Sequence, residues 1–121
     1  MKLNTILFAL WLAACPAWAG GWKTVRKIAQ VAVAATTAGD MATSWQAGQR
    51  GAVEVNPICS GRFGLRQTAI LGGMTAGEMV LQLIVMRHHP ELEKRVAIAD
   101  FGAAGLHGWM IVRNSQIRRI K

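Results

Sequence analysis

Three long apolar segments separated by short polar ones make up most of the chain, and they span residues 28–47, 65–86 and 96–112. Within each segment, polar side chains recur at intervals of three, four or seven residues, which places them on one face of a helix. Gly48 and Gly51 follow the first segment, and glycine is typical of a helix C-terminus. The pattern predicts an all-α fold, a small bundle of three apolar helices.

Each predicted helix carries an ionisable residue inside its apolar sequence. A carboxylate in such a segment is costly unless it has a partner, so we expect the polar faces to point toward the other helices. The polar faces comprise Thr36, Thr37, Asp40, Thr43 and Ser44 in the first helix, Thr75, Glu78 and Gln82 in the second, and Asp100, His107 and Asn114 in the third.

Four of these residues, Asp40, Glu78, Asp100 and His107, form a candidate polar site inside the bundle. Carboxylates with a histidine suit a divalent metal or a proton relay. The alternative is that they hydrogen-bond across helices and fix the packing. His107 is the cationic candidate deep in another apolar segment, so we predict that it pairs with Asp40. No spacing matches a metal-binding or catalytic motif, which leaves metal, cofactor and reaction unspecified and favours a non-enzymatic role.

The turn after the first helix contains Glu54, Asn56 and Pro57. Asn-Pro is typical of a helix start, with Asn as the cap and Pro at the first helical position. In that interpretation Glu54 pairs with Arg50 or Arg62. The alternative is a loop that presents Glu54 to a ligand or a partner.

The sequence DMATS at 40–44, followed by EVNP at 54–57, resembles a motif of a family of small uncharacterised bacterial membrane proteins. Members of that family carry an Asp-x-x-Thr-Thr-like helix, a Gly-containing turn, Glu-x-Asn-Pro and two further apolar helices. Ser44 stands where a second Thr is usual. The resemblance implies a multi-helix membrane domain and no particular activity. The residues that it marks are Asp40, Thr43, Glu54, Asn56 and Pro57.

Residues 1–19 are predicted to be a signal peptide, because a basic start and a short apolar run precede Ala-Trp-Ala, with cleavage between Ala19 and Gly20. Two alternatives are lipidation of Cys15 and retention of the segment as an uncleaved membrane anchor. All three place Gly20 beyond the inner membrane. Residues 20–121 are then a single helical domain.

The composition favours a membrane protein, since 52% of residues are hydrophobic and 17% are charged, against about 25% charged in soluble domains. The net charge of +8 lies in short clusters between apolar segments. That arrangement is typical of membrane-protein loops and argues against nucleic-acid binding. Gly73 and Gly77 form a Gly-x-x-x-Gly stripe suited to close helix packing or a homo-oligomer.

We therefore expect a small exported protein of the bacterial inner membrane, with a structural or partner-binding role. A membrane proton, metal or transporter-like site at the buried acids is one alternative. A soluble, basic periplasmic helical protein is another.

Overall fold

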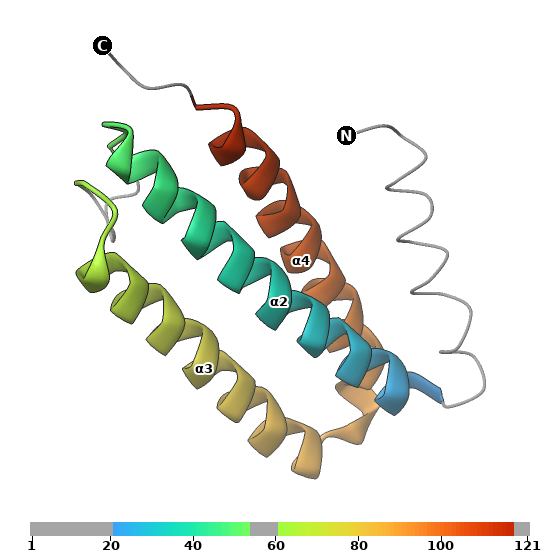
Figure 1. Ribbon diagram of the computed structural model, residues 1–121. Helices are drawn as coiled ribbons and strands as arrows, with labels where there is room; N and C mark the ends of the chain where they lie inside the picture. The colour runs from blue at the N-terminus through green and yellow to red at the C-terminus, as the bar shows by residue number, and fades with distance from the viewer. Residues whose placement is uncertain (1–20, 54–60, 118–121) are drawn as a thin grey trace.

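The computed structural model describes residues 21–53 and 61–117, which fold into a bundle of three α-helices (Figure 1). The helices are α2 (Gly21–Gln49), α3 (Leu65–His88) and α4 (Glu93–Ser115), and the 3-10 helix η2 (Pro90–Leu92) joins the last two. Figure 1 shows α2 between α3 and α4. The chain reverses twice, so α2 and α4 run parallel and α3 runs antiparallel to both. The prediction of an all-α bundle of three helices is confirmed.

Two helices are longer than the apolar pattern predicts. α2 begins at Gly21, so the basic segment 21–27 is helical, and α4 runs from Glu93 to Ser115 instead of covering 96–112. The extra turns carry polar residues that bond across the two helices. The Arg26 guanidinium of α2 hydrogen-bonds the Glu93 carboxylate of α4. Apolar periodicity does not reveal such a tertiary contact, which explains the short predictions.

A single register relates α2 and α4 along their whole length. Arg26 pairs with Glu93, Asp40 with His107, and Arg50 with the backbone of Ile117, and each pair is separated by 67 residues. On both helices the facing residues recur with alternating spacings of four and three, the repeat of a parallel coiled coil. We call these two rows the seam. It comprises Arg26, Gln30, Val33, Thr37, Asp40, Ser44 and Ala47 on α2, and Glu93, Ala97, Asp100, Ala104, His107, Ile111 and Asn114 on α4.

Small residues let the two backbones of the seam approach each other. Of the seam residues, Ala97 is completely buried and Ala104 and Ala47 are nearly so, and Ala29 beside the seam is also completely buried. Polar groups share this interior, because Thr37 and Asp100 are each only 3% exposed. The bundle therefore buries polar side chains in the place where a soluble helical protein buries large apolar ones.

α3 packs far more sparsely than the other two helices. Its large apolar side chains face outward, and few of its residues are buried. Gly73 and Gly77 lie on the exposed side, with no atom within 4 Å of the position that a Cβ would take. The described helices therefore do not pack on this glycine stripe. The exposed large apolar side chains of α3 are Leu65, Met74, Val80, Leu81, Leu83 and Ile84.

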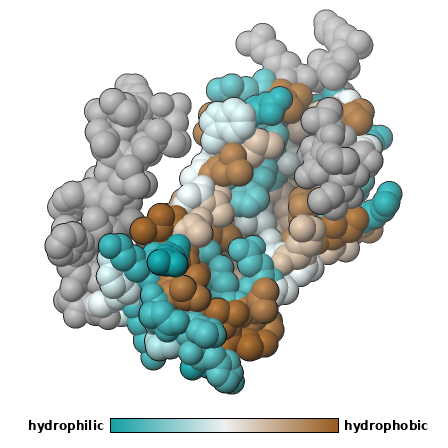
Figure 2. All heavy atoms as spheres, turned by 180° about the vertical axis from the view of Figure 1, so that it is seen from behind, coloured by the Kyte–Doolittle hydropathy of each residue, from teal (hydrophilic) through white to brown (hydrophobic). Residues whose placement is uncertain are grey.

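The outward faces of all three helices form an apolar band. In residues 28–45, 67–86 and 96–112 every exposed residue is an apolar residue or a glycine, with the single exception of Glu78. On the face in Figure 2, hydrophilic side chains gather most densely at the lower end of the molecule. At 1.5 Å per residue these ranges are about 25–30 Å long. The hydrocarbon core of a bilayer is about 30 Å thick.

A polar seam as the candidate functional site

Asp40 lies at the centre of a hydrogen-bonded cluster between α2 and α4. His107 Nδ1 donates to Asp40 Oδ2 at 2.8 Å, and Asn114 Nδ2 donates to Asp40 Oδ1 at 3.0 Å. Asn114 also reaches Ser44 Oγ at 2.8 Å. The Asp40 side chain is 14% exposed and that of His107 is 30% exposed. We call these four residues the Asp40 cluster, and the predicted pairing of Asp40 with His107 is confirmed.

Not every polar residue near Asp40 joins the cluster. The Thr36 and Thr43 hydroxyls bond backbone carbonyls of their own helix, at Ala32 and Gly39. This is the usual local alternative for a threonine in a helix. Thr43, which the sequence places on the face of Asp40, therefore makes no side-chain bond across the bundle.

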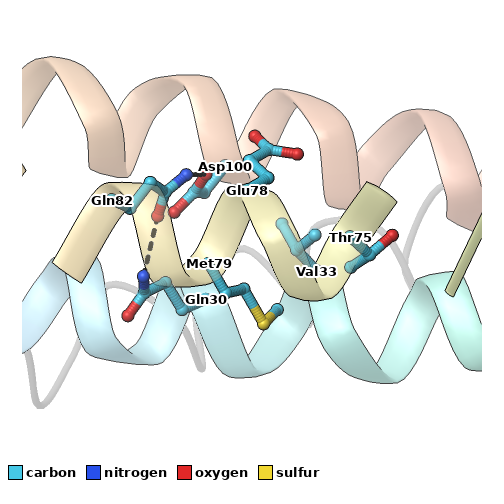
Figure 3. A pocket seen from close by; sticks show the side chains of 7 residues that line it. All are labelled: Gln30, Val33, Thr75, Glu78, Met79, Gln82 and Asp100. Carbon is cyan, nitrogen blue, oxygen red and sulfur yellow. Dashed lines mark hydrogen bonds between the residues drawn. The ribbon is translucent and has the colours of Figure 1, made fainter. Parts of the chain in front are cut away.

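A second group of polar residues joins all three helices closer to the N-terminal ends of α2 and α4 than the Asp40 cluster lies. Gln30 Nε2 donates to Gln82 Oε1 at 2.7 Å, and Gln82 Nε2 donates to Asp100 Oδ1 at 2.8 Å. We call these residues the Asp100 cluster. They line a pocket that also contains Glu78 and Thr75 (Figure 3). This chain of amides is the polar connection between the loosely packed α3 and the seam.

The four ionisable residues of the predicted polar site thus fall in two places. Asp40 and His107 bond each other, whereas Asp100 and Glu78 line a pocket about two helical turns away along α4. The seven-residue interval between Asp100 and His107 puts them on one face and also separates them along the axis. The role of Gln30 could not be predicted from the sequence, because an isolated glutamine in a helix gives no signal of its partner.

An ion pair closes the seam at the N-terminal ends of α2 and α4. The side chains of Arg26 and Glu93 are 4% and 11% exposed, and Arg26 also donates to Gln30 Oε1 at 2.7 Å. The sequence pattern assigns neither ion-pair residue to a site. Arg26 stands in a basic segment and Glu93 in a polar loop, so nothing in either context indicates burial.

A second pocket opens beside the Asp40 cluster, at the C-terminal ends of α2 and α4. Ser44 and Asn114 line it together with Arg113 and the apolar side chains of Phe63 and Met110. Two members of the Asp40 cluster, Ser44 and Asn114, therefore line a pocket, whereas Asp40 and His107 do not.

Several predicted features give no site in the described part of the chain. Glu54, Asn56 and Pro57 lie outside the described residues. Within 21–53 and 61–117, no three His, Cys, Asp or Glu side chains are grouped as metal ligands. In the exposed turn after α3, the backbone N–H of Glu91 and the His89 ring hydrogen-bond the Glu91 carboxylate and lower its pKa below the ordinary value.

Comparison with protein-family models, curated proteins and solved structures gave no match to this chain. The resemblance of 40–44 and 54–57 to a membrane-protein family therefore stays a prediction. The candidate site is argued from its own geometry.

Proposed function

We propose that this chain is a small integral protein of the bacterial inner membrane with a structural, partner-binding role. The observation that carries the proposal is the apolar band, because the outward faces are apolar over a membrane-sized length while the polar residues face one another. A soluble helical protein has the opposite distribution, with charged residues on its outer faces.

The polar residues of the seam account for a difference in mean hydropathy between the helices. By length and mean hydropathy, α3 is the one helix of the described residues that qualifies as a membrane span. α2 and α4 contain the polar residues of the seam, which lower their mean hydropathy. Those residues face the other helix, so lipid would meet only the alanine, valine, isoleucine, leucine, glycine and tryptophan of the outer faces. Sheltered polar residues are compatible with insertion of all three helices.

Alkaline carbonate extraction tests integration into the membrane. We expect the protein to stay with the membranes after the wash and to float with them in a sucrose gradient, which excludes aggregates. Replacing two exposed apolar residues near mid-span, Val80→Lys in α3 with Leu106→Lys in α4, should abolish this behaviour, because a lysine at mid-span costs about 2.5–3.5 kcal/mol of insertion free energy. Gln116→Lys, outside the band, is the matched control and should change nothing. Release of the natural chain into the carbonate supernatant would refute the proposal.

The membrane topology should place the N-terminus of α2 outside and the C-terminus inside. An export signal followed by three spans gives this orientation, and the basic residues agree weakly with it. The outer segments carry Lys23, Arg26, Lys27, Arg87, Lys94 and Arg95, and the inner ones carry Arg50, Arg62, Arg66, Arg113, Arg118, Arg119 and Lys121. A green fluorescent reporter after Lys121 should fluoresce, and alkaline phosphatase after Arg87 should be active. Phosphatase activity after Lys121 instead of after Arg87 would reverse the topology.

A second candidate function is proton transfer through the Asp40 cluster. It is favoured by the 2.8 Å contact of a carboxylate with a histidine and by the two cluster members that line the neighbouring pocket. An intramembrane carboxylate–histidine pair is a recurrent proton relay. Variants of Asp40 separate this role from a structural one.

A further inference from the structure

Glu78 is the exception in the apolar band. It lies near the middle of α3, it is exposed, and no hydrogen bond or ion pair to another described residue holds its carboxylate. Its exposed neighbours on α3 include Met74 and Leu81. If this surface faces lipid, as the proposed function requires, a lone carboxylate at that depth needs a partner.

A second carboxylate beside Glu78 also lacks a partner on one oxygen. Asp100 is 3% exposed, and its Oδ2 atom has no hydrogen-bond partner among the described residues. Asp100 and Glu78 line the same pocket, one from α4 and the other from α3 (Figure 3). A buried acceptor without a donor is rare in native proteins, and such an atom calls for an explanation.

The described basic residues nearest to this pocket along the seam are already bonded. Arg26 is bonded to Glu93 and Gln30, and His107 is bonded to Asp40. The other described basic side chains belong to the ends of the helices and to the turns. The bundle thus presents two acidic groups within the apolar band and supplies neither with a cation from within the described residues.

We propose that the surface around Glu78 and Asp100 docks the transmembrane helix of another protein, one that carries a lysine or arginine near its middle. This inference rests on the proposed membrane location. The apolar side chains of Met74 and Leu81 would pack against the incoming helix. Its cation would pair with the exposed Glu78 carboxylate, and the buried Asp100 carboxylate behind it would add negative charge to the site. A second copy of this chain fits poorly, because it would bring the same acidic groups and, within residues 21–53 and 61–117, offers no unpaired cation at that depth.

The test uses the full chain in phosphatidylcholine vesicles, with a donor fluorophore at its C-terminus, and a synthetic polyleucine helix with an acceptor. We expect energy transfer to a helix with a central lysine at a peptide-to-lipid ratio about tenfold lower than to one with a central leucine, as an interhelical polar contact in a membrane allows. Glu78→Gln should remove this preference. Glu91→Gln, which alters an exposed carboxylate in the turn after α3, is the matched control and should retain it.

Two outcomes would overturn the inference. One is equal transfer to the lysine and leucine helices, which would leave only unspecific apolar association. The other is transfer between copies of the chain that Glu78→Gln does not alter and that the lysine helix does not displace, which would assign the surface to a homo-oligomer. Carbonate extraction of the same Glu78→Gln protein keeps the tests apart. If the variant stays in the membrane and the wild type shows no preference for the lysine helix, the proposed partner is refuted but the proposed membrane location is not.

Discussion

Replacing Asp40 with alanine is expected to destabilise the bundle by about 1–3 kcal/mol, the usual cost of leaving buried hydrogen-bonding groups without partners. The substitution removes the acceptor of His107 and Asn114 together, at 2.8 and 3.0 Å. Unfolding of the purified protein in detergent, followed by circular dichroism, measures the effect. Thr43→Ala is the matched control on the same helix, since its hydroxyl bonds only its own backbone, and it should cost less than about 0.5 kcal/mol.

Asp40→Asn separates a structural role from proton transfer. The Asn carbonyl can still accept from Asn114, and its amide can donate to His107 once that ring takes its other tautomer. A structural role therefore predicts near-normal stability and function for Asn, with loss of both for Ala. Proton transfer predicts that Asn folds and has no function. If Asp40→Ala changes neither stability nor function, the Asp40 cluster does not organise the bundle.

The sequence predicts the pairing of Asp40 with His107 but does not determine where the other acids lie. A helical period places each polar residue on a face, and the pairing of a histidine inside one apolar segment with a carboxylate inside another follows from the cost of leaving either alone. The position of Asp100 depends on the register between helices that are distant in the chain. That register results from seam residues such as Ala97 and Ala104. In the sequence, an alanine buried between helices cannot be distinguished from an alanine that faces lipid. The same limitation concealed the burial of Arg26 and Glu93.

The polar seam also supplies a physical reason for the parallel register. In coiled coils, a polar residue in an otherwise apolar seam fixes alignment at some cost in stability. Here a slip of α4 by one heptad would move His107 away from Asp40 and Glu93 away from Arg26 at once. Two polar contacts with the same offset thus discriminate against every shifted alignment.

The buried ion pair at the end of the seam should show the largest single effect. Glu93→Ala leaves the Arg26 guanidinium, whose side chain is 4% exposed, with Gln30 as its remaining side-chain partner. Removing one member of a buried pair typically costs about 3–5 kcal/mol.

Replacing both residues, as Arg26→Met with Glu93→Leu, should restore stability to within about 1 kcal/mol, because a well-packed apolar pair avoids the desolvation of two charges. The same detergent unfolding assay measures both variants. Arg95→Ala, at an exposed position two residues further along α4, should cost less than about 0.5 kcal/mol. A double variant as unstable as Glu93→Ala alone would mean that the charges themselves, and not the burial of an unpaired one, hold α2 and α4 together.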